Sequence, residues 1–400
     1  MMQATQQIRI RQIAATVKEN TNVFSFDYKL LGVVFILLML GLVMVGSASI
    51  SIADKQLSDP FYYLLRQLSY VGIGLIAAYA VLHIPLSVWE MAGPWLIIVS
   101  MLLLVMVLTP GLGREVNGSV RWLNLGPVTV QASELVKLFV IIYLSGYLVR
   151  HHNEVRTNAA GFIKPMVLLS LLALLLLLEP DYGAVAVMLI TATGMLWLAG
   201  ARMFQFILLL LSLSVALALL AVTSPYRMER LTTFINPWAD PFNSGFQLTQ
   251  ALIAFGRGEW LGVGLGASVQ KLFYLPEAHT DFMLAVLAEE LGLITVLIVI
   301  GLYTFIVLRA LRIARKAEQR ERPFAAYLAY GIGIWIGLQA FINIGVNMGV
   351  LPTKGLTLPL MSYGGSSLVV MCIAVALLLR VDFETRCADR RTQNNRGKPW

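Results

Sequence analysis

The chain has 400 residues, of which 58% are hydrophobic and only 13% charged, and its mean hydropathy is +0.76. These values exclude an ordinary soluble globular domain and favour a protein whose solvent is the lipid bilayer. The net charge of +8 is spread over separate loops and tails, which favours membrane topology and anionic lipid over nucleic acid as its cause. Cys372 and Cys387 are the only cysteines, so neither a disulfide framework nor a cysteine metal site is indicated.

Long apolar runs divide the chain into membrane spans. A helix needs roughly 20 apolar residues to cross about 30 Å of hydrocarbon. Ten runs meet this requirement, which predicts an all-α polytopic membrane protein with a first span that is not cleaved. In chain order, the runs are Leu30–Ile50, Leu64–Leu82, Met91–Leu108, Ala132–Val149, Phe162–Leu178, Tyr182–Leu198, Phe204–Val222, Phe282–Leu308, Phe324–Val346 and Ser362–Leu379.

The basic residues predict the orientation of these spans. With an even number of spans the two termini share one side, and that side collects 20 of the 30 Lys and Arg residues. Loops rich in Lys and Arg stay in the cytoplasm, so both termini are predicted to be cytoplasmic. We therefore expect a cytoplasmic segment at 1–29, a transmembrane domain at 30–380 and a cytoplasmic tail at 381–400.

Three of the predicted outer segments are long, and function should be sought there. They are Leu112–Val130, Thr223–Asp281 and Gly349–Met361. The second, residues 223–281, is expected to fold back onto the membrane with a short amphipathic helix over Phe246–Phe255. The glycines of Gly256–Gly266 predict turns or close backbone packing, since no strand precedes them as a dinucleotide loop would require.

Ionisable residues near the membrane are costly unless they pair, face water or serve a function. Glu134 and Lys137 lie three residues apart and predict an ion pair on one helix face. Glu179 and Asp181 flank Pro180 in a tight outer turn, where turn structure is a sufficient explanation.

Two basic residues stand near the predicted outer face. Arg66 begins the second span, and Lys354 lies in the last outer loop. Each could hold a phosphate or anchor the chain to lipid headgroups, and anchoring is the simpler interpretation of either residue alone.

The end of the long loop carries the candidate chemistry. Thr280 or Asp281 is placed to cap the eighth span. Glu289 and Glu290 follow about two turns later, which predicts a patch of carboxylates beside Asp281 at the boundary of lipid and water. A general base that takes a proton from a hydroxyl, with cations that hold a departing phosphate, fits a lipid-phosphate substrate.

Metal ligation by histidine is not favoured. His83, His151 and His152 lie towards the predicted cytoplasmic side, and His279 stands alone outside. A divalent cation such as Mg²⁺ or Mn²⁺, bound by carboxylates together with a pyrophosphate, is the one cofactor left open.

Several motifs occur in one order along the chain and are far more specific together than any short pattern. They resemble the SEDS family, which includes FtsW and RodA, over about Leu30 to Arg380. Within the family, the Ala278 position and the serine pair of the last motif are more similar to the cell-division members than to RodA. The motifs are NGSVRWLNLG, VQASELVK, EPDYG, NPWADPFNSGFQ, LPEAHTDF, AVLAEELG and LPTKGLTLPLMSYGGSS.

The resemblance implies a peptidoglycan glycosyltransferase of the bacterial inner membrane. It implies that lipid II is polymerised into β-1,4 glycan at the division septum, together with the class B penicillin-binding protein FtsI and other division proteins. The family's catalytic aspartate falls on Asp281. The supporting positions that the resemblance implies are Arg66, Glu134, Lys137, His279, Lys354 and Ser362.

One carboxylate would suffice for this reaction. Direct displacement of an α-linked pyrophosphate by a hydroxyl gives a β linkage, so no second carboxylate nucleophile is required. The nearby helix N-terminus is expected to lower the pKa of Asp281. Two alternatives remain open from the sequence, an elongation polymerase similar to RodA and a lipid II flippase. The second is disfavoured because transport sites lie near the membrane midplane, whereas these charges lie near span ends.

Overall fold

The computed structural model describes residues 27–116, 119–124, 126, 129–201, 204, 234–243, 245–353 and 355–396. Residues 1–26, Lys354 and all but the first residue of the predicted span Phe204–Val222 lie outside the described residues. The elements are α2 Tyr28–Leu57, α3 Tyr62–His83, α4 Leu86–Leu108, β1 Gly113–Val116, β2 Ser119–Asn124, β3 Thr129–Gln131, α5 Ala132–Arg150, α6 His152–Thr157, α7 Ala159–Leu178, α8 Tyr182–Leu198, η1 Pro237–Ala239, α11 Phe246–Gly258, α12 Met283–Gln319, α13 Pro323–Asn347 and α14 Gly365–Arg396.

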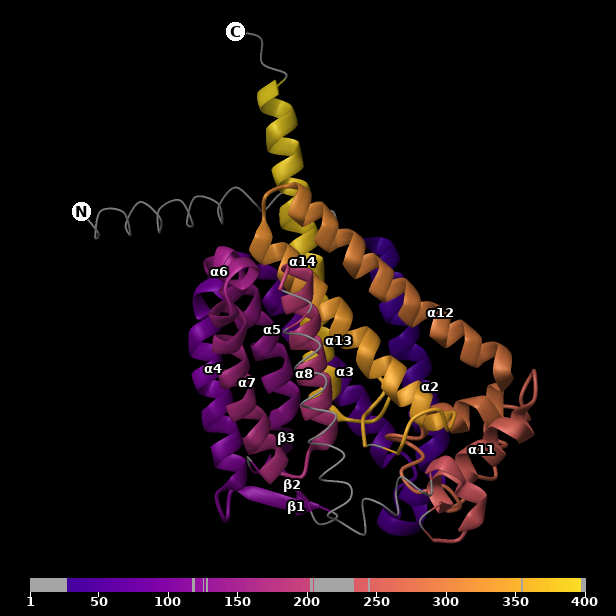
Figure 1. Ribbon diagram of the computed structural model, residues 1–400. Helices are drawn as coiled ribbons and strands as arrows, with labels where there is room; N and C mark the ends of the chain where they lie inside the picture. The colour runs from indigo at the N-terminus through magenta and orange to yellow at the C-terminus, as the bar shows by residue number, and fades with distance from the viewer. Residues whose placement is uncertain are drawn as a thin grey trace.

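The helices confirm a polytopic membrane fold. Among the described residues, eight helices are long and apolar enough to cross a membrane, and α8 is a shorter apolar helix. Together they cover every predicted span except Phe204–Val222. The predicted amphipathic helix is also confirmed, as α11 at Phe246–Gly258. Helix α14 continues past the predicted end at Leu379 and leaves the bundle (Figure 1).

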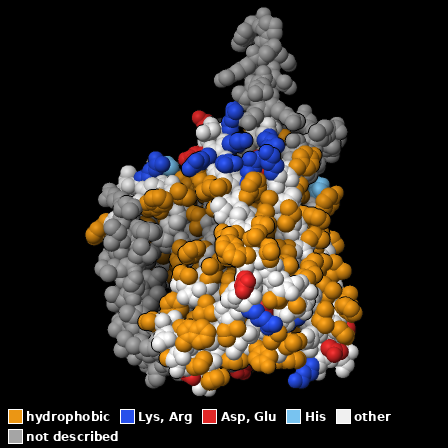
Figure 2. Space-filling view, turned by 90° about the vertical axis from the view of Figure 1, so that its right-hand side faces the viewer, with side chains coloured by type: hydrophobic (Ala, Val, Ile, Leu, Met, Phe, Trp, Pro, Cys, Tyr) orange, Lys and Arg blue, Asp and Glu red, His pale blue; other side chains and the backbone are white. Residues whose placement is uncertain are grey.

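The bundle has two chemically different ends. Strands β1–β3 and helix α11 lie at one end, which we call the site end (Figure 1). The opposite end, where α12 finishes and α14 emerges, is called the basic end. Figure 2 shows a broad band of hydrophobic side chains with Lys and Arg gathered at the basic end. The charge asymmetry read from the sequence is therefore present along the axis of the bundle.

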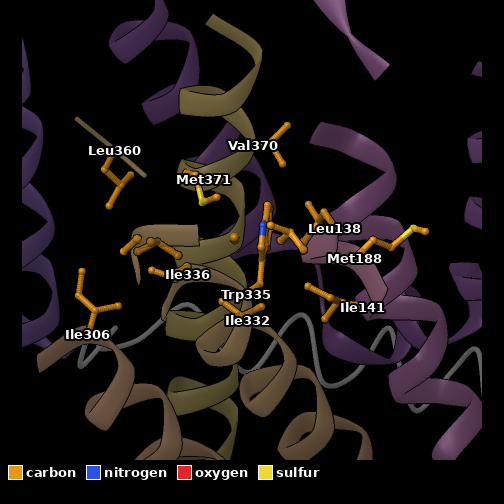
Figure 3. Close-up of a cluster of buried hydrophobic side chains, with 14 of the residues drawn as sticks. Leu138, Ile141, Met188, Ile306, Ile332, Trp335, Ile336, Leu360, Val370 and Met371 are labelled. Atoms are coloured by element: carbon orange, nitrogen blue, oxygen red, sulfur yellow. The ribbon is translucent and has the colours of Figure 1, made fainter. Parts of the chain in front are cut away.

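Helices α5, α13 and α14 form the interior of the bundle. Most of the apolar, membrane-crossing segment of each is buried, whereas less than a third of that segment is buried within the protein in α3, α4 and α12. Trp335 of α13 is fully buried, with Leu138 and Ile141 of α5 and Met188 of α8 nearby (Figure 3). Apolar side chains thus face both the core and the outside, as expected for helices that pack in lipid.

The predicted outer loop Leu112–Val130 contains a small antiparallel sheet that the apolar runs did not reveal. Strand β2 lies in the centre, pairing with β1 and β3 in the order β1-β2-β3. The run SVRWLN of β2 combines β-branched and aromatic residues that favour a strand. Strand β3 leads directly into α5, so the sheet closes the site end of that helix.

The eighth span is not the single helix Phe282–Leu308 that the sequence predicts. Gly292 has φ 77° and ψ 176°, which breaks α12 near its start. The glycine-rich segment replaces the interrupted helical hydrogen bonds, as backbone groups at membrane depth require. On the near side of the break, the N–H groups of Val263 and Gly264 donate to the carbonyls of Glu289 (2.9 Å) and Glu290 (3.0 Å). On the far side, the N–H groups of Leu293 and Ile294 donate to the carbonyls of Glu259 (2.9 Å) and Trp260 (3.2 Å).

This backbone contact explains the glycines. Gly262 has φ +80°, and a Cβ there would lie 2.2 Å from the carbonyl oxygen of Glu290. Only glycine fits both the conformation and the space. The prediction of close backbone packing over Gly256–Gly266 is confirmed at this position.

Candidate functional site

Asp281 follows a tight turn at the end of the LPEAHTDF motif. The N–H groups of Thr280 and Phe282 both donate to the carbonyl of Glu277 at 3.2 Å, and the Thr280 hydroxyl donates to Glu277 Oε2 at 2.7 Å. The N-cap of α12 is Phe282, without a side-chain cap. The prediction that Thr280 or Asp281 caps this helix is therefore wrong, because Thr280 is used by the turn and Asp281 points elsewhere.

The Asp281 carboxylate faces the last loop of the site end. A Cβ built at Gly355 would lie 3.0 Å from Asp281 Oδ2, so the two segments are in close contact. The charged groups that act on the carboxylate are Glu277, Asp181 and Arg121. Among the hydrogen bonds between described residues, none ends on the carboxylate oxygens of Asp281. Those oxygens can therefore accept a hydrogen bond from a substrate hydroxyl.

Burial raises the pKa of Asp281 to about 7, and the negative charge of Glu277 adds to this effect. Arg121 opposes it and Asp181 reinforces it. The sequence predicts a lowered pKa from the helix N-terminus. That prediction is wrong because desolvation and neighbouring carboxylates outweigh a dipole that Asp281 does not cap. A base with a pKa near the working pH is stronger than an ordinary aspartate and still substantially ionised.

The backbone of Asp281 is fixed by α13. Asn343 Nδ2 and Asn347 Nδ2 each donate to the Asp281 carbonyl oxygen at 2.9 Å. Sequence reasoning missed both residues. Their spacing of four residues in an otherwise apolar helix, which puts both amides on one face, was the available signal.

The predicted ion pair of Glu134 and Lys137 is confirmed, with 2.8 Å between Oε1 and Nζ. Both side chains are buried, and Lys137 Nζ also donates to Gln339 Oε1 at 3.0 Å. Gln339 in turn donates to the carbonyl of Thr357 at 3.1 Å. The pair is therefore connected to the last loop through α13, and it lies inside the bundle.

An aromatic cluster links Arg66 to the loop of Asp281. Arg66 Nη1 donates to the Tyr62 hydroxyl at 2.8 Å, at the start of α3. The ring of His279 lies 4.7 Å from that of Tyr63 and 5.5 Å from that of Tyr363, between ring centroids. The N–H of Tyr363 donates to the His279 carbonyl at 3.0 Å. Burial lowers the pKa of the His279 imidazole, and the negative charge of Glu277 opposes this effect.

The last loop holds the remaining predicted positions. Ser362 Oγ accepts a hydrogen bond from the N–H of Leu358 at 2.9 Å, which shapes the turn before α14. Gln67 donates to the Ser362 carbonyl at 3.3 Å. Lys354 lies outside the described residues, and its neighbour Gly355 is the residue that contacts Asp281.

Glu289 and Glu290 do not form the predicted patch with Asp281. Both are fully buried and bind the long loop. Glu290 receives Lys271 Nζ at 2.7 Å and the Ser47 hydroxyl at 2.8 Å. Glu289 accepts hydrogen bonds from the Ser268 hydroxyl and from two backbone N–H groups of that loop. The prediction of a carboxylate patch beside Asp281 at the boundary of lipid and water is wrong, because Glu289 and Glu290 are buried and anchor the chain that covers them.

The turn between α7 and α8 combines two different carboxyl groups. Asp181 caps α8 through the N–H of Ala184 at 3.2 Å and accepts from the Ser133 hydroxyl at 2.8 Å, as turn chemistry predicts. Glu179 is fully buried, and neither carboxyl oxygen has a hydrogen-bond partner among the described residues. Burial, reinforced by Asp181, raises the pKa of Glu179 to about 8. The described residues contain no group of three or more His, Cys, Asp or Glu that could hold a metal ion.

The fold and the Asp281 carboxyl group define a polytopic membrane protein with a potential base at the site end. Comparisons with known proteins identify its relatives. The FtsW/RodA/SpoVE family, described as cell cycle protein, matches residues 28–387. The chain is 62% identical over 360 residues to the probable peptidoglycan glycosyltransferase FtsW of Nitrosococcus halophilus, covering 90% of this chain and 93% of that protein. It is 56% identical over 361 residues to the FtsW of Legionella pneumophila, covering 90% and 92%.

Solved structures agree with this relationship. A chain from the work "Structural coordination of polymerization and crosslinking by a peptidoglycan synthase complex" has a TM-score of 0.74 and 30% identity, covering 91% of this chain and 99% of that one. RodA of Thermus thermophilus has a TM-score of 0.66 and 27% identity, covering 90% and 98%. The protein therefore belongs to the SEDS family, the family of FtsW and RodA.

Proposed function

We propose that the protein is a peptidoglycan glycosyltransferase that polymerises lipid II during septal cell-wall synthesis. The observation that carries the proposal is Asp281, a carboxyl group at the site end with a pKa of about 7 and oxygens free of described hydrogen-bond donors. The curated relatives named FtsW are 52–62% identical to this chain, whereas the RodA structure is 27% identical. This difference favours the division member over an elongation polymerase.

Asp281 acts as the general base. Its carboxylate removes the proton from the GlcNAc 4-hydroxyl of one lipid-linked glycan as that oxygen attacks the MurNAc anomeric carbon of another. The new C–O bond forms as the bond to pyrophosphate breaks, and undecaprenyl pyrophosphate leaves with the electron pair. A single displacement inverts the anomeric centre and gives the β-1,4 linkage.

Cationic groups stabilise the leaving pyrophosphate in this mechanism. Arg66 stands at the site end of α3 and is joined to the Asp281 loop by the aromatic cluster. Lys354 adjoins Gly355, which contacts the Asp281 carboxylate. Fixed positive charge at the point where negative charge develops lowers the barrier without reorganisation during the reaction. Glu134 and Lys137 support the site through Gln339.

The basic end faces the cytoplasm in this proposal, because Lys and Arg collect on that side of bacterial membrane proteins. Both termini then lie in the cytoplasm, and Asp281 faces the outer side of the inner membrane. The partner is a class B penicillin-binding protein, FtsI, with other division proteins. The similarity to a chain of a complex that coordinates polymerization and crosslinking supports such a partner.

The decisive experiment replaces the base. Asp281→Asn keeps the size of the side chain and removes its basicity, so polymer formation from lipid II by the chain purified with its transpeptidase partner should fall at least about a hundredfold. Asp59→Asn, the same change in the loop between α2 and α3, should stay within about twofold of the original protein. A folded Asp281→Asn protein that polymerises normally would overturn the assignment. Lipid II crossing reconstituted vesicles without polymer would favour a flippase.

A further inference from the structure

Three amide side chains form a row along the inner face of α13. Gln339, Asn343 and Asn347 are spaced four residues apart, which places them above one another on a helix. Their exposed fractions are 0%, 2% and 0%. A buried amide is costly unless its polar atoms are hydrogen-bonded, so the partners of this row show what the row holds in place.

Asn343 joins two loops that are distant in the sequence. Its Nδ2 donates to the carbonyl oxygen of Asp281 at 2.9 Å and to that of Leu356 at 2.6 Å. The first loop carries the proposed base. The second loop contains Gly355, the residue that contacts the Asp281 carboxylate. One side chain therefore sets the separation between the base and the segment opposite it.

The neighbouring amides strengthen the same arrangement. Asn347 Nδ2 is the second donor to the Asp281 carbonyl at 2.9 Å, and Asn347 Oδ1 accepts from the N–H of Ala285 in the first turn of α12 at 3.2 Å. Gln339 Nε2 donates to the carbonyl of Thr357 at 3.1 Å, one residue beyond Leu356. Both loops are thus fastened to one rigid helix face.

We propose that Asn343 is a positioning residue that holds the Asp281 carboxylate at its attack distance. The proposal rests on the proposed function of Asp281 as base. A reacting pair must approach to about 3–3.5 Å, and a displacement of about 1 Å can cost a hundredfold in rate. Asn343 binds backbone carbonyls on the inner side of the Asp281 loop, so its loss should act on the chemical step and leave substrate affinity unchanged.

Steady-state kinetics of lipid II polymerisation, with the transpeptidase partner present, test this role. In Asn343→Ala, kcat should fall by about tenfold or more while KM stays within about twofold. Asn347→Ala should have a smaller effect, because Asn343 still donates to the Asp281 carbonyl. The double variant should lose more than the product of the two single losses, because the carbonyl then has neither donor.

Tyr147→Phe is the control. The hydroxyl of the buried Tyr147 of α5 donates to the carbonyl of Gly161 in α7 at 2.9 Å, towards the basic end, so its loss removes an interhelical hydrogen bond away from Asp281. Its kcat should stay within about twofold of the original protein, although its unfolding temperature should fall in a similar way to that of Asn343→Ala. A purely structural role for Asn343 would give both variants the same kinetics.

The remaining outcomes are also decisive. An Asn343→Ala protein with an unchanged kcat, or a change confined to KM, would overturn the proposal. If this variant does not fold, Asn343→Asp is the second test. It retains the size of the side chain but places a hydrogen-bond acceptor against the two carbonyl oxygens, so its kcat should fall as well. Failure of both variants to fold, with Asn347→Ala fully active, would assign the row a structural role only. An inactive Asp281→Asn beside an active Asn343→Ala refutes this inference alone, whereas an active Asp281→Asn refutes the proposed function.

Discussion

Two sets of carboxyl groups at the site end, all fully buried except the half-buried Asp281, have opposite surroundings. Glu289 and Glu290 are surrounded by donors, with Lys271 Nζ 2.7 Å from Glu290 and the Ser268 hydroxyl bonded to Glu289. Glu179 and Asp281 have no described donor on their carboxyl oxygens, and their pKa values rise to about 8 and about 7. The first set is paired with cations and hydrogen-bonded, and it anchors the long loop. The second set is left able to exchange protons near neutral pH, as functional carboxyl groups require.

The sharpest disruption of the first set is Lys271→Met, which removes the cation and keeps most of the apolar stem. It leaves Glu290 fully buried without its charge partner, which should lower the free energy of unfolding by about 3–5 kcal/mol. Denaturant titration of the purified protein measures the change. Because Lys271 also donates to the Ser47 hydroxyl at 2.9 Å, the contact between α2 and the long loop should loosen as well.

An exposed ion pair is the control for this prediction. Lys164 and Glu154 are separated by 2.9 Å, yet their side chains are 53% and 43% exposed. Lys164→Met should therefore lower the free energy of unfolding far less than Lys271→Met does. The double variant Lys271→Met/Glu290→Gln removes both charges and should recover much of the lost stability. Equal effects of Lys271→Met and Lys164→Met would mean that burial is not what makes the anchor strong.

The second set predicts the pH dependence of polymerisation. Asp281 must be ionised to act as a base, and burial raises its pKa to about 7. The rate should therefore rise with pH up to about 7 and fall about tenfold for each unit below it, so that about a hundredfold is lost by pH 5. Initial rates of polymerisation measured from pH 5 to pH 8.5 give the midpoint, the pH at which the rate is half of its maximum.

Neighbouring charges should move that midpoint in known directions. Glu277→Gln removes a negative charge that raises the pKa of Asp281, so the midpoint should shift to lower pH. Arg121→Met removes the opposing positive charge and should shift it upward. A midpoint near pH 4 that neither change moves would mean that Asp281 is not the group that controls the rate.

Sequence alone could identify the spans but not their interruptions. Apolar runs locate the helices because each must cross the same thickness of hydrocarbon, and nine of the ten runs correspond to described helices. The break at Gly292 depends on hydrogen bonds from Val263 and Gly264, about 30 residues earlier in the chain. Such a partner is found only when the loop is placed in space, so the apolar run predicted an unbroken helix.

The candidate site was also predictable only in part, because some of its features depend on contacts between distant segments. The position of Asp281 and the pair of Glu134 and Lys137 follow from motif and spacing. The pKa of Asp281 could not be predicted, because it is set by burial and by Glu277 and Asp181, and only the folded chain brings Asp181 near. The role of Asn343 was hidden because its partners, the carbonyls of Asp281 and Leu356, carry no side-chain signature.

The smallest expected effect is on the pH dependence of the free energy of unfolding, where Glu179 and Asp281 contribute in different pH intervals. A carboxyl group whose folded pKa is raised binds its proton more tightly in the folded state, so stability is highest at acid pH and falls as pH rises. For Asp281 this decline runs from about 3.8 to about 7, and for Glu179 from about 4.5 to about 8. Each titrating group contributes a slope of about 1.4 kcal/mol per pH unit inside its window.

Glu179→Gln keeps the shape and cannot ionise, so it should remove the decline contributed by Glu179. Between pH 7 and pH 8 both groups are still titrating, so the unfolding free energy of the original protein should fall by about 1.4 kcal/mol, and that of Glu179→Gln by only about 0.4 kcal/mol. Asp281→Asn should instead roughly halve the slope between about pH 4.5 and pH 7 and change the upper interval by only about 0.4 kcal/mol. Denaturant titrations at pH 5, 7 and 8 resolve the two intervals. A Glu179→Gln profile parallel to the original would show that Glu179 is paired as an anion, like Glu290, and would remove the distinction between the two sets.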